Sequence, residues 1–178
     1  RIENFTYYHQ DINEFVEEKI TPLLSLICDK EMVLFKDKIN WKLSKGDGFK
    51  AHQDQPAWSD FNIERFYSVA LFAGPSIKEN GCLQFVTDEN NIGLLSKDGC
   101  LPQEIEKKFN WEYFETYPRD LLIFDSYIPH KSDKNNSGNS RSIFYFTFNS
   151  LEEGNFYTEY VKKKDNISLL QMNEEINL

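Results

Sequence analysis

A histidine and an aspartate two residues apart, His52 and Asp54, place the strongest constraint on how this 178-residue chain folds. Side chains alternate along a β-strand, so on one strand these two residues point to the same face and both reach a single ion. His130 ends an apolar run over residues 120–130 and offers a third ligand. Two histidines and one carboxylate are the ligand set of a non-haem Fe(II) centre that keeps open positions. The sequence therefore predicts two distant strands that line one interior around a metal site.

The alternative explanation for the spacing of His52 and Asp54 is chance, because a His-x-Asp pattern alone is common. Two further residues in strand contexts favour the metal site, namely His130 and, eleven residues later, Arg141. The remaining histidine, His9, lies just before a predicted helix and outside any ligand pattern, which is typical of a surface or capping residue.

The segment 38–43 alternates strictly between apolar and polar residues, which predicts a strand. Its polar set is Lys38, Asn40 and Lys42. In a half-exposed strand this set faces water; in a barrel that binds its ligands inside, the same set lines the pocket. Before it, apolar residues recur at helical spacing over residues 12–27, which predicts an amphipathic helix that is kinked or restarted at Pro22.

Composition and charge exclude several classes of protein. The net charge of -9 argues against a nucleic-acid partner, which requires a basic face. The three cysteines show no C-x-x-C spacing, so they indicate neither a disulfide framework nor a zinc site. No apolar run reaches eighteen residues, and no signal peptide is recognisable at the start, so we expect no membrane span and a cytoplasmic location.

At this point the sequence resembles the phytanoyl-CoA dioxygenase family of Fe(II)- and 2-oxoglutarate-dependent oxygenases. The motifs that carry the resemblance lie between about residues 31 and 155 and are His52-Gln53-Asp54, Asn80-Gly81-Cys82-Leu83, Phe124-Asp125-Ser126, His130-Lys131-Ser132 and Arg141. The resemblance implies an all-β core with flanking helices, folded as a double-stranded β-helix, which is the cupin-like jelly roll. It also implies Fe(II) as the metal and 2-oxoglutarate and O2 as cosubstrates.

One oxygenase domain is expected over residues 1–178. Its predicted parts are a helical flank over about 1–30, a jelly-roll core over about 31–150 and a peripheral tail over about 151–178. A polar insertion is expected at 87–119, with a helix over 103–109. Because the chain does not begin with Met, and the family has a further helical region before this point, we expect an N-terminal segment to be missing from the sequence.

The resemblance assigns roles to four residues around the cosubstrate. Arg141 would clamp the distal carboxylate of 2-oxoglutarate, because a guanidinium forks onto a carboxylate with two hydrogen bonds. Ser132 would add a hydroxyl to the same cosubstrate, and Asn40 and Ser68 stand where relatives have cosubstrate contacts. For Ser68 the alternative is a structural hydrogen bond inside a buried strand.

The substrate is the least constrained part of the prediction. Residues 35–43, the stretch after His52 and residues 124–130 look most similar to bacterial oxygenases that hydroxylate small aminophosphonates, and less so to ectoine hydroxylases. Both act on compact zwitterions. Lys38 or Lys42 would bind the anionic end and Trp58 or another aromatic residue the ammonium end, with Gln55 as a further contact. Trp58 has a common alternative role as a plug that packs its loop onto the core.

Two functions from different classes therefore remain at this stage. The first is hydroxylation of a C–H bond of a small polar metabolite, with release of succinate and CO2. The second is a catalytically inactive or cupin-like metal-binding member of the same fold. Arg141 favours the first, since a protein that uses its metal alone does not need a carboxylate clamp.

Overall fold

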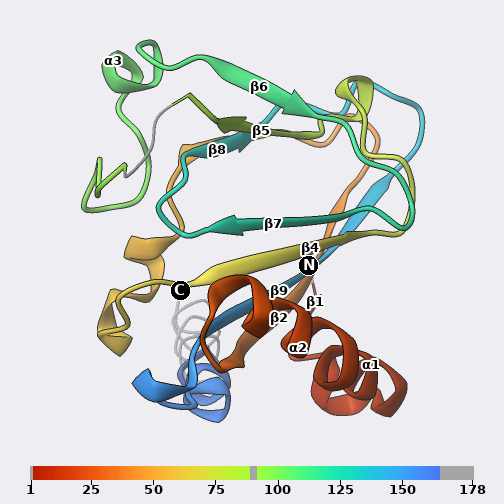
Figure 1. Ribbon diagram of the computed structural model, residues 1–178. Coiled ribbons are helices and arrows are strands. Elements are labelled where there is room, and N and C mark those ends of the chain that lie inside the picture. Colours follow the sequence, from red (N-terminus) through yellow and green to blue (C-terminus); the bar gives the residue numbers. More distant parts are fainter. Residues whose placement is uncertain (1, 89–91, 165–178) are drawn as a thin grey trace, which may run out of the picture.

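The computed structural model describes residues 2–88 and 92–164 and shows two antiparallel sheets that face each other (Figure 1). The larger sheet has the order β1-β2-β9-β4-β7, and the smaller has the order β3-β8-β5-β6. The strands of the larger sheet are β1 (Ile2–Glu3), β2 (Met32–Lys42), β9 (Arg141–Ser150), β4 (Tyr67–Phe72) and β7 (Leu121–Asp125). Those of the smaller are β3 (Phe49–His52), β8 (His130–Ser132), β5 (Leu83–Val86) and β6 (Trp111–Phe114). The predicted jelly roll is confirmed.

The pairing of β2 with β9 decides which residues face the interior. Lys42 pairs with Arg141, Asn40 with Ile143 and Lys38 with Tyr145, so the members of each pair share one face of the sheet. Ile143 is fully buried between the sheets, which makes this the inner face. On the same strand Trp41 is 49% exposed and points outward. The polar row of β2 therefore faces the interior, as a barrel with internal ligands requires.

Helices cover the outer face of the larger sheet (Figure 1). They run as α1 (Gln10–Phe15), a π-helical turn (Val16–Ile20) and α2 (Thr21–Cys28), with Pro22 in the first turn of α2. Proline is tolerated in the first turn of an α-helix, where its missing N–H is not needed, and the π-helical turn ends two residues before Pro22. The predicted restart at Pro22 is confirmed.

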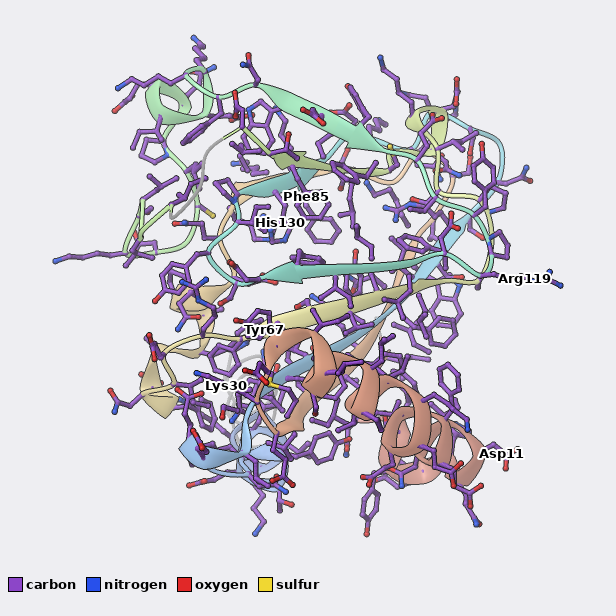
Figure 2. All side chains as sticks on the ribbon, viewed as in Figure 1. Asp11, Lys30, Tyr67, Phe85, Arg119 and His130 are labelled. Atoms are coloured by element: carbon purple, nitrogen blue, oxygen red, sulfur yellow. The ribbon has the colours of Figure 1, made fainter. Side chains whose placement is uncertain are left out.

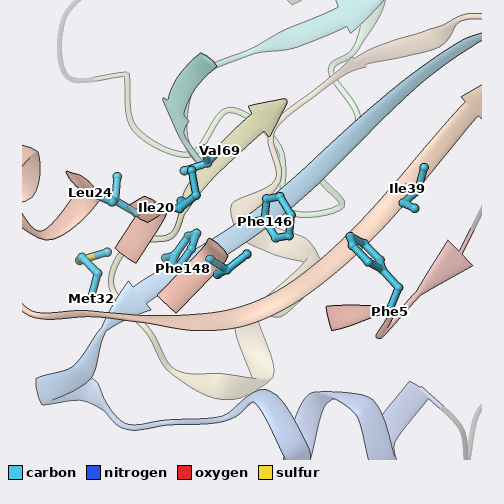
Figure 3. Packing of buried hydrophobic residues seen from close by; sticks show 9 residues of the cluster. Phe5, Ile20, Leu24, Met32, Ile39, Val69, Phe146 and Phe148 are labelled. Atoms are coloured by element: carbon cyan, nitrogen blue, oxygen red, sulfur yellow. The ribbon is translucent and has the colours of Figure 1, made fainter. Parts of the chain in front are cut away.

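The buried stripe of these helices is narrower than the sequence indicates. Val16, Ile20 and Leu24 pack on Val69, Phe146 and Phe148 of the sheet in one hydrophobic cluster (Figure 3). Phe15, Leu23 and Ile27, which follow the same helical spacing, are more than 40% exposed. The π turn adds a residue and rotates the helical register, so the two helices do not share one continuous apolar face.

A second cluster joins the predicted tail to the core. Tyr160 is 6% exposed and packs with Phe35, Trp58, Ile63 and Phe66. It belongs to the helical residues 157–164, which follow the short 3-10 helix Leu151–Glu153. Of the tail that was expected to be peripheral, the described residues 151–164 thus contribute a core side chain, whereas 165–178 lie outside the described residues.

The region 87–119 also differs from its prediction as an insertion. Its last part forms β6, which pairs with β5 and completes the smaller sheet. Its helix is the short α3 (Gln103–Glu106), four residues long where seven were predicted.

The remaining helices among the described residues are the 3-10 turns Thr6–Tyr8, Gln55–Phe61 and Lys78–Asn80. None of the helices among the described residues has the length and apolarity needed to cross a membrane.

Candidate metal centre

The three predicted metal ligands meet inside the jelly roll. His52 ends β3 and pairs directly with His130, the first residue of β8, so that their ring centroids are 4.1 Å apart. Asp54 follows two residues later and starts the 3-10 helix Gln55–Phe61. The pairing of β3 with β8 therefore brings together ligands that lie 78 positions apart in the sequence.

The donor atoms face one another without being bonded to one another. Asp54 Oδ1 lies 3.6 Å from His52 Nε2, and Asp54 Oδ2 lies 3.9 Å from His130 Nε2. Both distances exceed a hydrogen bond. All three ligand atoms lie within 4.8 Å of one another, which fits a single ion between them.

Backbone carbonyls fix which nitrogen of each histidine faces the ion. His52 Nδ1 lies 2.7 Å from the carbonyl oxygen of Lys50, and His130 Nδ1 lies 3.1 Å from that of Ile128. A proton on Nδ1 satisfies these carbonyls and leaves the Nε2 lone pair for a metal. The donor set therefore fits a divalent transition-metal ion.

The charge states of the ligands suit a metal as well. Burial raises the pKa of Asp54, but the positive charges of His130, Lys38, Lys36 and His52 outweigh it and lower that pKa to about 2. Burial and the neighbouring His52 lower the pKa of His130 to about 4. Near neutral pH the site therefore presents a carboxylate and a neutral imidazole, which are the ligand forms that bind metal.

A small cavity opens beside the triad, between the two sheets. Its further lining includes Lys38 and Asn40 from β2, Tyr145 from β9, and the apolar side chains Phe49, Leu83 and Phe124. Phe85 and Phe124 pack on the ring of His130, with centroid distances of 5.7 and 5.1 Å. Figure 2 shows His130 and Phe85 in the space between the sheets. Lys38 lies 4.9 Å above the ring of Tyr145, so a cation and an aromatic face border the same cavity.

Arg141 lies on the same inner face, at the start of β9. It is 6% exposed, and burial lowers the pKa of its guanidinium. The guanidinium forms a hydrogen bond with the side chain of Tyr145. Its Nε is buried and has no hydrogen-bond partner among residues 2–88 and 92–164. A buried donor without a partner is costly, and a carboxylate at this place removes the cost. The residue thus fits the clamp that the sequence predicts.

The other predicted cosubstrate contacts differ in their surroundings. Asn40 lines the cavity, and Ser132 lies two residues after His130 on β8, on the same inner face. Ser68 also faces inward, but its hydroxyl lies 3.2 Å from Thr147 Oγ1 on the neighbouring strand. That hydrogen bond is the structural alternative foreseen for Ser68.

Gln55 and Trp58 are not brought to the cavity. The amide of Gln55 donates to the carbonyl of Ile63 and accepts from Ser126 Oγ, so both of its ends are used to fix the loop. Trp58 is 5% exposed and packs on Phe35 and Phe66, with the ammonium of Lys36 4.1 Å from its ring. The placement corrects the expectation that these two residues border the substrate, because the 3-10 turn after Asp54 rotates them toward the second cluster.

Sequence reasoning missed Tyr145, although a signal was present. It lies four residues after Arg141 on one strand, and this even spacing places both side chains on the inner face. Gln53, between the two ligands, points away from the metal as expected. Its side-chain Nε2 donates to the carbonyls of Gly93 and Tyr127, and its Oε1 accepts from the backbone N–H of Leu95. These bonds join the loop before α3 to the segment that carries His52 and Asp54.

The fold and the triad together define a jelly-roll protein with a 2-His-1-carboxylate metal centre. Comparison with known families agrees, since the phytanoyl-CoA dioxygenase model matches residues 7–143. The chain belongs to the phytanoyl-CoA dioxygenase family.

Two curated relatives cover most of the chain. It is 37% identical to a 2-aminoethylphosphonate dioxygenase of an uncultured bacterium (HF130_AEPn_1) and 35% identical to a methylphosphonate hydroxylase of Gimesia maris. Each match covers 92% of this chain and 64% of the relative, so the chain spans less than two thirds of their length. The solved structures of EctD from S. alaskensis with 2-oxoglutarate and 5-hydroxyectoine, and of the epimerase SnoN, share the fold.

The EctD structure has a TM-score of 0.71 at 16% identity and covers 85% of this chain and 56% of its own. SnoN, described as a non-haem α-ketoglutarate-dependent epimerase, has a TM-score of 0.66 at 13% identity, with coverages of 84% and 60%. At such identities these two likenesses establish the fold alone.

Proposed function

We propose that this protein is an Fe(II)- and 2-oxoglutarate-dependent dioxygenase that hydroxylates a C–H bond of a small, zwitterionic, aminophosphonate-like metabolite. The observation that carries the proposal is the combination of a 2-His-1-carboxylate triad with a buried arginine, Arg141, whose Nε lacks a partner among the described residues. A metal-binding protein without a cosubstrate has no use for such an arginine. The catalytically inactive alternative is therefore the weaker one.

In this proposal His52, Asp54 and His130 hold Fe(II), and Arg141 and Ser132 bind the distal carboxylate of 2-oxoglutarate. Iron, once bound with 2-oxoglutarate and O2, supplies the oxidation of the substrate C–H bond, while 2-oxoglutarate becomes succinate and CO2. Asn40 lies on the cavity wall between the triad and Arg141 and is placed to orient the cosubstrate by a hydrogen bond. The apolar walls from Leu83, Phe124 and Phe85 exclude water from this part of the cavity.

The substrate class rests on the charge inside the cavity and on the relatives. Lys38 carries a positive charge beside Asp54 and above the ring of Tyr145, where an anionic phosphonate group would bind. Phe49 and Tyr145 provide aromatic faces for an ammonium end, in place of the predicted Trp58. The names of the two curated relatives, which act on phosphonates, support the same class.

The test is substrate-stimulated succinate formation with Fe(II), 2-oxoglutarate and O2. We expect 2-aminoethylphosphonate or a related small zwitterion to raise the rate above that of 2-oxoglutarate alone, and Lys38→Ala to weaken the response. Lys30→Ala is the matched control, because this exposed lysine lies on the outer, helical side of the molecule (Figure 2). Stimulation only by acyl thioesters or bulky apolar compounds would overturn the substrate class and leave the metal site standing.

A further inference from the structure

A buried lysine, Lys42, lies beside Arg141 on the inner face of the larger sheet, and the proposed function leaves it without a role. It is 5% exposed, and its backbone pairs with Arg141 across the two strands. Its ammonium donates three hydrogen bonds, to Ser132 Oγ at 2.8 Å, to the carbonyl of Gly81 at 3.2 Å and to the carbonyl of Asp133 at 2.5 Å. All three N–H donors of the charged lysine are therefore used.

The surrounding backbone is shaped to bring these acceptors close. Gly81 has a φ of +73°, and a Cβ at this position would lie 2.2 Å from the Asp133 carbonyl oxygen and 2.9 Å from Lys42 Nζ. Gly48 also has no room for a side chain, because a Cβ there would lie 2.1 Å from the carbonyl oxygen of Ser132. The two glycines allow three segments to converge on one ammonium group.

These contacts determine which hydrogen bonds the hydroxyl of Ser132 can still make. Its oxygen accepts from Lys42 Nζ and, at 3.3 Å, from the backbone N–H of Phe49. A serine hydroxyl has two acceptor positions and one proton, so both acceptor positions are filled and only the O–H remains. No hydrogen bond among the described residues uses that O–H, and the side chain shares the inner face with His130. Ser132 is thus held as a donor whose O–H finds no acceptor among the residues that the structure describes.

We propose that Lys42 is a positioning residue for the cosubstrate: by bonding Ser132 Oγ it turns that hydroxyl into a donor for the distal carboxylate that Arg141 binds. The inference rests on the proposed function, since it takes 2-oxoglutarate as the ligand. It explains why a lysine with no remaining donor lies beside the arginine clamp, and it gives the Asn80-Gly81-Cys82 turn a role in cosubstrate binding through the Gly81 carbonyl.

The charges around Lys42 support an anion here. Burial, followed by the positive charge of Arg141, lowers the pKa of Lys42 to about 8, although Asp133 and Cys82 act in the opposite direction. A carboxylate bound next to both cations raises the pKa of Lys42 again. Binding of 2-oxoglutarate therefore favours the protonated lysine, and its affinity falls as pH rises through about 8.

A double-mutant cycle tests the inference, with 2-oxoglutarate binding measured by anaerobic titration of the Fe(II) protein. We expect Lys42→Met and Ser132→Ala each to weaken binding by roughly 10-fold, as expected for losing a hydrogen bond to a charged group. We expect Lys42→Met/Ser132→Ala to bind about as weakly as either single variant. For Lys42→Met the loss should appear in the 2-oxoglutarate concentration for half-maximal rate more than in the rate at saturation, and Lys42→Arg should bind more tightly than Lys42→Met.

Additive effects in the cycle would show that Lys42 acts without Ser132 and would overturn the inference. If Lys42→Met does not fold, the cycle is run with Lys42→Arg, which keeps the charge: this change should weaken binding in the parent and have a much smaller effect in the Ser132→Ala background. An equal effect of Lys42→Arg in both backgrounds would likewise overturn the inference. If the parent itself does not bind 2-oxoglutarate, the proposed function fails and the inference fails with it, which is a distinct result.

Discussion

The interior between the two sheets has a metal end, formed by the triad, and an Arg141 end, formed by the residues around that arginine, and the two are organised differently. At the metal end, Asp54 and the two histidines face one another at 3.6 and 3.9 Å and make no hydrogen bonds among themselves. At the Arg141 end, Lys42, Ser132 and two backbone carbonyls are already joined by hydrogen bonds. The metal end is completed by an ion, whereas the Arg141 end is assembled by the protein.

Because of this difference, changes at the metal end should affect the reaction, whereas changes at the Arg141 end should affect binding and stability. The hydrogen bonds of the two histidine ligands are local, to the carbonyls of Lys50 and Ile128, so the loss of a metal ligand should remove the reaction and leave the chain folded. The Lys42 network joins β2, the turn before β5 and the end of β8, so its loss should disturb both binding and stability. The predictions below test that contrast.

Loss of a metal ligand should have the largest effect. Asp54→Ala and His130→Ala should each lower turnover by more than about 100-fold, since even the loss of an outer hydrogen-bond partner of a ligand costs roughly 10- to 100-fold. Steady-state succinate formation and Fe(II) binding are the measurements. Thermal unfolding should remain cooperative, and His9→Ala, which changes an exposed histidine, should behave like the parent. Near-normal turnover of His130→Ala would remove it from the metal site.

Arg141→Lys should have the next largest effect, at the other end. A lysine keeps the charge but cannot form two parallel hydrogen bonds with a carboxylate. The 2-oxoglutarate concentration for half-maximal rate should rise by roughly 10- to 100-fold, which corresponds to a loss of about 1.5–3 kcal/mol. Arg65→Lys is the control, because Arg65 pairs with Asp125 outside the cavity. If Arg141→Lys saturates like the parent, the carboxylate is held elsewhere.

Gly81→Ala should affect stability as well as binding. The positive φ and the close approach to Asp133 and Lys42 leave no room for a methyl group, and strain of this kind costs about 1–3 kcal/mol. Chemical denaturation gives the loss, and 2-oxoglutarate titration gives the accompanying loss of affinity. At Gly74 an added Cβ meets no atom within 4 Å, so Gly74→Ala should change neither quantity. Unaltered stability and binding of Gly81→Ala would mean that the Lys42 network tolerates a shift.

Trp58→Phe should have the smallest effect, and only on stability. Trp58 packs in the second cluster, away from both ends of the cavity, and lies under the ammonium of Lys36. We expect a loss of about 1 kcal/mol in the free energy of unfolding. The half-saturating concentrations of substrate and 2-oxoglutarate should stay within about twofold of the parent. A selective rise in the value for the substrate would return Trp58 to the binding site.

The metal end could be predicted from sequence because its information is local. Strand periodicity predicts that His52 and Asp54 reach one ion, and the family motif leads to the same residues and to His130. The structure brings the three together, although β3 ends at His52 and Asp54 lies just beyond it. The inward direction of Lys38 and Asn40 was open from the sequence alone. Their register with β9 decided it, because Lys38 pairs with Tyr145 on the inner face.

The Arg141 end could be predicted only in part, because it depends on long-range pairing. Arg141 and Ser132 follow from the motifs, but the bond from Lys42 to Ser132 joins residues 90 positions apart. Gln55 and Trp58 do not line the cavity for a related reason: β3 ends at His52 and a 3-10 helix follows Asp54, so the period-two alternation of a strand no longer applies. Strand β6 was hidden in a polar stretch that resembled an insertion.

The central claim is that one cavity holds a metal at one end and the 2-oxoglutarate carboxylate at the other. Its most direct test is an anaerobic titration of the Fe(II) protein with 2-oxoglutarate, followed by visible absorption. The parent should develop a saturable charge-transfer band, His130→Ala should develop none, and Arg141→Lys should develop the same band only at much higher 2-oxoglutarate. No band in the parent, or an equal band in His130→Ala, would contradict the account.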